Sequence, residues 1–550
     1  MAVGVLGGVL AWLLRGLIAF FHDLAFLGRL SFVYDANQHT PLGPLGPGVA
    51  LVPALGALAV VFLIRRFAPE ARGHGVPEVM DAIHYQKGVI RPVVALIKAL
   101  ASAITIGTGG SVGREGPIIQ IGAAAASACG QVLGVSRWQL ATLVGAGGGA
   151  GIAATFNTPI GGILFAVEVL LPEVSARTLV PVALATATAT AVGRALFGDT
   201  PAFHVPPLEL AERFSLLPVY LGLGALSALA AVAFIRAVYG AEDLCERWVP
   251  NPYLRHVLGM LAVGGLFTTL AYAVGHYHVA GIGYATVVEV ITGKVTGVGL
   301  LLLLFALKML ATSLTLGSGG SGGIFSPCLF LGATLGAAYG LALDALLPGH
   351  GIQPAVLALA GMAGVLSGAT GATLTAVVMV FEMTRDYAVI LPMALSAAVG
   401  RGLARALLAD TIYSLKLSRR GHALPEALHA NAHLVHHVAD LSLSPVHVHG
   451  ATPEGPPPEA HLVVLDGAEV VGVAPPERAS VVARATELAS ADFVVVTPDR
   501  TLFQLLADLQ AAKASTAVVV APGEPGRVLG VITKAHLAEA LAEGLEMFEG

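Results

Sequence analysis

Long runs of apolar residues, separated by short polar turns, fill the chain up to about residue 415. A helix needs about 20 mostly apolar residues to cross a bilayer. Several runs approach or reach that length: residues 49–63, 179–196, 217–238, 257–274 and 298–314. The pattern predicts an all-α domain that crosses a lipid membrane many times.

Other apolar segments are shorter and are interrupted by glycine and proline, as at residues 145–151 and 361–371. These segments predict helices that stop partway across the bilayer. Irregular backbone at membrane depth is tolerated only where protein buries it or where it lines a water-filled cavity. We therefore expect the chain to enclose a path for an ion or a solute.

The composition indicates the same class of protein. Of 550 residues, 55% are hydrophobic and 12% are charged, where soluble domains carry about 25% charged residues. The apolar character ends near Leu417, so we predict a membrane domain over residues 1–420 and a soluble domain over residues 421–550. The net charge of −5 gives no indication of nucleic-acid binding, and the three cysteines have no disulfide or metal spacing. No metal or other cofactor is expected.

Part of the membrane domain is duplicated. Lys98, Thr105, Gly107, Gly110, Ser111 and Pro117 recur in the same order and spacing as Lys308, Thr315, Gly317, Gly320, Ser321 and Pro327. Further along, Glu168 corresponds to Glu382. We predict two repeats, over about residues 1–200 and 215–415. Transporters built from repeats place their site where broken helices of the two copies meet near the midplane.

A glycine-rich loop leads into an apolar helix in both copies, at residues 113–117 and 323–327. Each loop carries a proline where the first turn of a helix is expected, a position at which the missing N–H costs nothing. Free amides and the helix dipole make such a helix start a site for anions. Two loops facing each other would hold an anion without a full positive charge, weakly enough for release.

Glu115 lies inside the first of these loops. A carboxylate at an anion site can occupy that site itself, and protonation would release it. Because ionisable residues within membranes are usually functional, we interpret Glu115 as a proton-operated gate. The alternative is a structural ion pair with Arg114, a residue that we interpret as structural.

Five motifs together resemble the CLC family of chloride channels and chloride/proton exchangers. They are "GHGVPEV" at residues 73–79, "GREGP" at 113–117, "FNTPIGGILFAVE" at 156–168, "GIFSP" at 323–327, and Tyr413. The resemblance covers about residues 3–420. It implies a homodimer in the cell membrane with a pore in each subunit, and each subunit is then built from two inverted repeats.

The resemblance also assigns residues. Glu115 matches the gating glutamate of the family, in the loop that Gly113 begins. The amides of Ile324 and Phe325 and the hydroxyl of Tyr413 are expected to hold the central anion, presumed to be chloride. Lys98 matches a basic residue beneath the pore.

Two positions depart from the family pattern. His74 stands where the family usually has a serine that contacts the anion. A protonated His74 would strengthen anion binding between about pH 5 and 8, a neutral one would donate a single hydrogen bond, and one turned to the cytoplasmic vestibule would make no contact.

The second departure follows Glu168, where exchangers typically carry another glutamate that relays protons and this chain has Val169. Val169 favours passive, channel-like conduction. Proton-coupled exchange stays the alternative, with His74, Glu168 or a water chain as the proton path. An alternative from a different functional class is a membrane sensor whose soluble tail binds a ligand. No grouping of nucleophile and base indicates an enzyme.

Residues 485–541 predict strand, helix, strand, strand and helix, with a helix start and its capping residue at Thr497–Asp499, and resemble a CBS motif. A degenerate partner precedes it, its helix replaced by a proline-rich stretch. His536 stands where such motifs carry an aspartate that reaches a nucleotide ribose, three residues after Thr533, so packing or dimerisation is favoured over nucleotide binding.

Two further features concern the region around the domain boundary. His429, His433, His436 and His437 are interpreted as solvated linker residues rather than as metal ligands. Basic residues follow two spans, namely Arg65, Arg66 and Arg72, and Lys416, Arg419 and Arg420. Basic loops favour the cytoplasmic side, so the tail is expected there.

Overall fold

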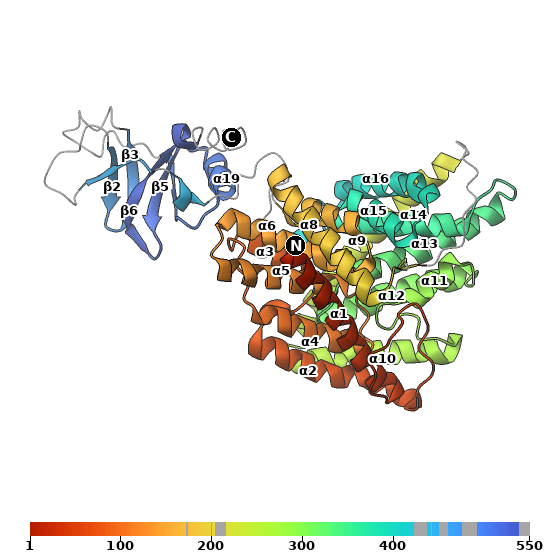
Figure 1. Cartoon of the computed structure of the whole chain (residues 1–550). Helices are drawn as coiled ribbons and strands as arrows, with labels where there is room; N and C mark the ends of the chain where they lie inside the picture. The colour runs from red at the N-terminus through yellow and green to blue at the C-terminus, as the bar shows by residue number, and fades with distance from the viewer. Residues whose placement is uncertain are drawn as a thin grey trace. The chain divides into compact units, whose positions relative to one another are not determined.

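The computed structural model describes residues 1–171, 174–199, 201–203, 216–422, 437–441, 443–449, 460–475 and 492–537. The chain divides into two compact units, Met1–Leu424 and Pro425–Gly550. The first unit is helical and the second is a small α+β domain (Figure 1).

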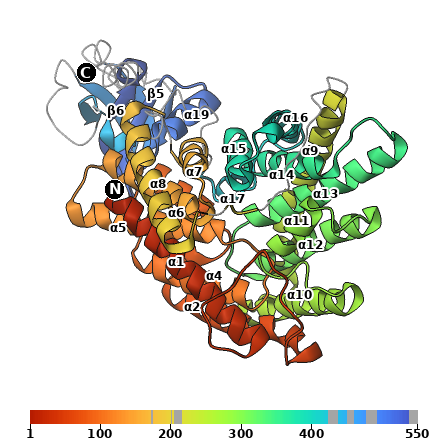
Figure 2. The ribbon, with the colours of Figure 1, turned by 45° about the vertical axis from the view of Figure 1, so that its right-hand side comes forward.

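The helices of the first unit fall into two sets, which occupy different sides of the unit in Figure 2. The first set is α1 (Ala2–His22), α2 (Val52–Phe67), α3 (Val76–His84), α4 (Val93–Gly107), α5 (Glu115–Leu133), α6 (Arg137–Phe156), α7 (Pro159–Phe165) and α8 (Ala176–Phe197). The second is α9 (Leu217–Trp248), α10 (Pro252–Val274), α11 (Tyr284–Ile291), α12 (Val298–Ser318), α13 (Phe325–Leu346), α14 (Pro354–Thr370), α15 (Thr373–Thr384) and α16 (Ile390–Leu407), followed by α17 (Ser414–Ser418).

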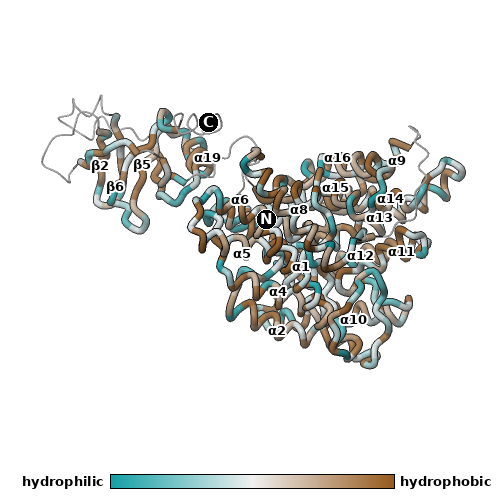
Figure 3. Tube along the Cα trace, viewed as in Figure 1, coloured by the Kyte–Doolittle hydropathy of each residue, from teal (hydrophilic) through white to brown (hydrophobic). Residues whose placement is uncertain are grey.

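Among the described residues, nine helices are long and apolar enough to cross a membrane. Each of the five predicted segments lies in one of them; residues 49–63, for example, lie within Gly46–Phe67. Apolar residues follow these helices along most of their length (Figure 3). Large apolar side chains also face outwards, as Leu55 does with 68% of its surface exposed. The unit is therefore a multi-pass membrane domain.

The glycines of residues 145–151 do not break a helix, so that part of the prediction was wrong, whereas Gly371 ends α14, which is too short to count among the nine spans. The glycines of both segments lie in or at the end of the helices α6 and α14. A β carbon at Gly147 would clash with the carbonyl oxygen of Gly122 in α5, and one at Gly361 would clash with that of Gly332 in α13. Glycine is needed here because the backbones of packed helices approach closely. The helix interruptions lie instead between α4 and α5 and between α12 and α13.

The second unit contains two sheets of the same topology. In the first, β1 (Val446–His449) pairs in parallel with β2 (His461–Asp466), which pairs antiparallel with β3 (Glu469–Ala474). In the second, β4 (Phe493–Val496), β5 (Thr516–Ala521) and β6 (Glu524–Thr533) repeat this order. The repetition shows two copies of one motif.

In the second copy, α19 (Leu502–Ala512) follows β4. Its cap is Thr501, in a capping box with Gln504, and lies beyond the predicted helix start at Thr497–Asp499. The box needs a glutamine or glutamate three residues after the cap, and Gln504 meets that spacing only from Thr501. The proline-rich stretch of the first copy and His429, His433 and His436 lie outside the described residues.

Candidate anion site at the paired glycine loops

The two glycine loops are bonded to each other. The Gly113 N–H donates to the Gly323 carbonyl at 2.7 Å, and the Gly323 N–H donates to the Gly113 carbonyl at 2.6 Å. Glu115 begins α5 two residues beyond Gly113, and Phe325 begins α13 two residues beyond Gly323. The structure thus brings together the starts of two helices from different repeats, where free amides gather.

A third loop, at residues 73–75, packs against this pair. The Gly73 N–H donates to the Gly320 carbonyl at 3.0 Å, and the Gly322 N–H donates to the Gly73 carbonyl at 3.2 Å. A β carbon at Gly116 would clash with the carbonyl oxygen of His74 and would lie 3.0 Å from Cα of Gly323. The motif at residues 73–79 therefore belongs to the same site as the two glycine loops.

A buried lysine supports this third loop. Lys98 has no exposed surface, and its Nζ donates to the carbonyls of Ala71 at 3.0 Å and Gly73 at 2.7 Å. In the second repeat, Lys308 donates in the same way to Val279 at 3.2 Å and Gly281 at 2.9 Å. Each lysine thus fixes a loop of its own repeat through that loop's backbone carbonyls.

The carboxylate of Glu115 is fully buried. Its Oε1 accepts hydrogen bonds from the Tyr284 hydroxyl at 2.7 Å and from the Ser326 hydroxyl. Its Oε2 has no hydrogen-bond partner among the described residues. The guanidinium of Arg114 makes no ion pair with Glu115 and lies over the ring of Phe156, 5.9 Å from its centroid. The geometry does not support the reading of Glu115 as the ion-pair partner of Arg114.

His74 lies between two tyrosines with only 4% of its surface exposed, so it is not turned out to solvent. Its Nε2 is 3.4 Å from the hydroxyl of Tyr239. That hydroxyl donates to the Ile412 carbonyl at 2.7 Å, so it accepts from His74. The His74 Nδ1 has no partner among the described residues, and the ring centroid is 5.9 Å from that of Tyr413.

The predicted anion ligands Ile324, Phe325 and Tyr413 are buried, with at most 2% of their surfaces exposed. Ile324 caps α13 and Phe325 is its first residue. Tyr413 immediately precedes α17, and the N–H of its neighbour Ile412 donates to the Ala369 carbonyl at 2.9 Å. That bond ties the tyrosine segment to the end of α14.

Glu168 caps a helix of the other repeat. Its oxygens accept the N–H groups of Leu374 at 3.0 Å and Thr375 at 2.7 Å, where α15 begins. Glu382 accepts those of Ile160 at 3.1 Å and Gly161 at 2.7 Å, where α7 begins. Such reciprocal contacts are what a two-fold relation between copies produces. Glu168 is therefore fixed as a cap, and the neighbouring Val169 is a buried apolar residue.

Sequence reasoning missed Tyr284, Ser326 and Tyr239. Tyr284 follows Gly281 and Gly283, which repeat the spacing of Gly73 and Gly75, so the second copy of that motif was a usable signal. Ser326 lies within the motif at residues 323–327, but no role was predicted for it. Tyr239 lies in the middle of α9, and nothing in its local sequence distinguishes it.

In the second unit, the Thr533 N–H donates to His536 Nδ1 at 3.2 Å. The other ring nitrogen, His536 Nε2, is 3.2 Å from the Ser444 hydroxyl. His536 therefore links Thr533 to the first copy of the motif.

Both units match known protein families. Residues 56–405 match the voltage gated chloride channel family and residues 485–543 match the CBS domain. The H(+)/Cl(-) exchange transporter ClcA of Vibrio cholerae is 34% identical over 382 residues, which cover 68% of this chain and 80% of that protein. A putative chloride channel protein, ClcB-like, of Ralstonia nicotianae is 32% identical over 67% of this chain and 85% of that protein.

Two solved structures share the fold. A slow cyanobacterial Cl-/H+ antiporter superposes with a TM-score of 0.66 at 25% identity, over 76% of this chain and 96% of that chain. A eukaryotic CLC transporter superposes with a TM-score of 0.64 at 20% identity over 97% of both chains. The chain is thus an anion-transport protein and not an enzyme, and it belongs to the CLC family, with a C-terminal CBS domain.

Proposed function

We propose that this protein exchanges chloride for protons and that Glu115 is the group that carries the proton. The observation that supports this most is the buried Glu115 carboxylate beside the paired glycine loops, held by Tyr284 and Ser326. The relatives named as H(+)/Cl(-) exchangers and the similar antiporter structure favour exchange over the passive conduction that Val169 predicted.

Competition for one position couples the two ions. The ionised carboxylate occupies the anion position beside the amides of Ile324 and Phe325 and the Tyr413 hydroxyl. Protonation removes its charge, and chloride then replaces it, because two negative charges cannot share the site. When chloride leaves, the carboxylate returns and gives up its proton. Helix-end amides suit this cycle because they hold either anion without a fixed cation.

The proton path to the cytoplasm passes His74 or water beside it. Val169 cannot carry a proton, and the oxygens of Glu168 are engaged by α15. His74 is close to Tyr413 and keeps a ring nitrogen without a partner among the described residues. It therefore replaces the missing relay carboxylate in this proposal.

Orientation and assembly are part of the same proposal. Arg72 pairs with Glu242 at 3.0 Å and Arg419 pairs with Asp243 at 2.9 Å, so two basic clusters from distant segments meet at the end of α9. Basic residues mark the cytoplasmic face, and the CBS domain follows Arg420. A homodimer in the cell membrane, with one pore in each subunit, is what the CLC resemblance implies. For the tail we propose a packing role rather than nucleotide binding. His536 stands where such motifs carry the aspartate that reaches the ribose, and it accepts a hydrogen bond from the Thr533 N–H instead.

The test is simultaneous measurement of chloride and proton flux in liposomes that contain the purified protein. An imposed chloride gradient should drive protons uphill. Chloride flux without proton movement would instead show passive conduction. Ligand binding by the tail without any flux would favour a sensor.

A further inference from the structure

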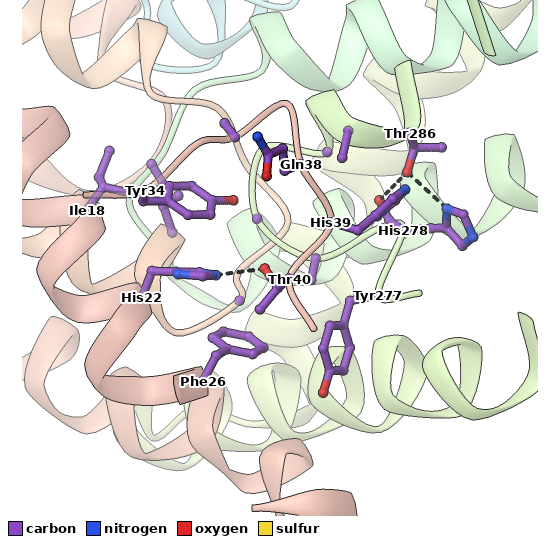
Figure 4. Close-up of a pocket in the computed structure, with 17 residues that line it drawn as sticks. Ile18, His22, Phe26, Tyr34, Gln38, His39, Thr40, Tyr277, His278 and Thr286 are labelled. Atoms are coloured by element: carbon purple, nitrogen blue, oxygen red, sulfur yellow. Dashed lines mark hydrogen bonds between the residues drawn. The ribbon is translucent and has the colours of Figure 1, made fainter. Parts of the chain in front are cut away.

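A cluster of metal-ligand side chains lies apart from the anion site. It comprises His39, in the segment between α1 and α2, His278, in the segment between α10 and α11, and Glu289 of α11. One ligand atom from each residue lies within 4.8 Å of the others. His39 Nε2 is 2.8 Å from Glu289 Oε2. The rings of His39 and His278, which come from segments far apart in the sequence, meet at one cavity (Figure 4).

The orientation of His278 leaves a ring nitrogen available to a ligand. The Thr286 hydroxyl donates to the His278 carbonyl at 3.3 Å, so at 3.0 Å it accepts from His278 Nδ1 (Figure 4). His278 Nε2 then carries a lone pair. It has no partner among the described residues, and the side chain is buried, with 5% of the residue exposed. A hydrogen bond from the far ring nitrogen is how proteins orient metal-binding histidines.

The donor set indicates which ions fit. Two imidazoles and a carboxylate suit zinc and similar divalent transition metals, whereas calcium and magnesium prefer oxygen ligands alone. The ring of His276, an exposed residue, stacks on His39 with a centroid distance of 4.1 Å.

The cluster faces the side of the membrane opposite the basic clusters. The span Gly46–Phe67 ends near Arg72, so its start, which His39 precedes, lies on the other side. The span Pro252–Val274 begins beside Arg255, which pairs with Glu246 at 3.4 Å near Arg72, and it ends just before His278. With the basic side cytoplasmic, both segments are external.

We propose that His39, His278 and Glu289 bind a divalent transition-metal ion of the zinc class at the external face, and that the bound ion slows transport. The link to the gate is α11, which has eight residues. This helix begins at Tyr284, the donor to Glu115, and it also carries Thr286 and Glu289. A metal that joins Glu289 to the segment of His39 restrains the helix that positions the gate. The external placement and the regulatory half of this inference rest on the proposed function, whereas metal binding by the three residues does not.

Binding is tested on the untagged full-length protein after EDTA treatment, with Co²⁺ as a spectroscopic probe and Zn²⁺ as its competitor. The wild type should give the visible absorption of nitrogen-ligated Co²⁺, reversed by Zn²⁺. H278A and E289Q should each weaken binding about tenfold or more. H350A, which removes an exposed histidine elsewhere, is the matched control. If Co²⁺ shows no such absorption with the wild type, or if H278A and E289Q bind as the wild type does, the site does not exist.

Regulation is tested by adding Zn²⁺ outside liposomes that contain the wild type, E289Q or H350A. Zinc should slow chloride flux about fivefold or more in the wild type and H350A, a usual size for coupling between sites, and not in E289Q. Binding without slower flux would overturn the regulatory half. The Co²⁺ experiment does not depend on transport. The effect of Zn²⁺ on chloride flux can be measured whether the protein exchanges protons or conducts passively. A negative result in either experiment can therefore be told apart from a failure of the proposed proton coupling.

Discussion

The two repeats share a scaffold and differ in the chemistry that it carries. Lys98 and Lys308 each hold a loop of their own repeat, and Glu168 and Glu382 each cap a helix of the other. At the anion site, however, Glu115 corresponds to Phe325, and His74 corresponds to Ile282. The duplicated parts therefore build the site, and in the proposed function the residues that differ between copies select and gate the ion.

The largest expected effect concerns the pair of Glu115 and Phe325. E115Q mimics the protonated gate permanently, so proton coupling should be abolished and chloride flux should become insensitive to pH. Simultaneous chloride and proton flux in liposomes measures both. F325L is the matched control, since it leaves the carboxylate in place and should keep coupled transport. Retention of the wild-type pH dependence by E115Q would remove Glu115 from the gate.

The buried lysines test the shared scaffold. K98M removes a donor from the carbonyls of Ala71 and Gly73, but these keep bonds from Ser321 and from the Gly322 N–H. K308M removes the Lys308 donor from the carbonyls of Val279, Gly281 and Ile282, at about 1–3 kcal/mol for each group left unsatisfied. Both variants should unfold at lower temperature in detergent, as followed by tryptophan fluorescence, and K308M should lose more stability than K98M. Equal losses would show that the second donors in the first repeat do not replace Lys98.

Comparison of the copies also explains what the sequence could and could not predict. The paired loops were predictable because the recurrence of Gly113 at Gly323 indicates two equivalent helix starts. The glycines near Gly147 were misread, because close helix packing and helix breaking select the same residue. Tyr239 and the group of His39, His278 and Glu289 depend on contacts between segments that are far apart in the chain, and no local pattern encodes such contacts.

A moderate effect is expected at His74. H74S restores the residue that the family usually has, so the preference among chloride, nitrate and bromide should change. A hydrogen bond contributes about 1 kcal/mol net, which corresponds to a change of about fivefold in relative permeation. I282S makes the same substitution in the other copy and should leave selectivity unchanged. Equal selectivity of H74S and the wild type would place His74 outside the anion path.

The smallest effect should come from the reciprocal caps. E168Q and E382Q keep one acceptor oxygen but replace the other with an NH2 group, which cannot accept the second helix N–H. They also remove the charge that favours a helix start, which is worth about 0.3–1 kcal/mol near a surface and up to about 2 kcal/mol when partly buried. Each variant should lower the unfolding temperature slightly, and both should keep the wild-type ratio of chloride to proton flux. The ratio is the sharper readout, because Glu168 lies next to Val169, where exchangers of the family carry their relay glutamate. A changed ratio in E168Q alone would mean that protons pass through Glu168 despite its bonds to α15, and the difference between the repeats would then extend to their caps.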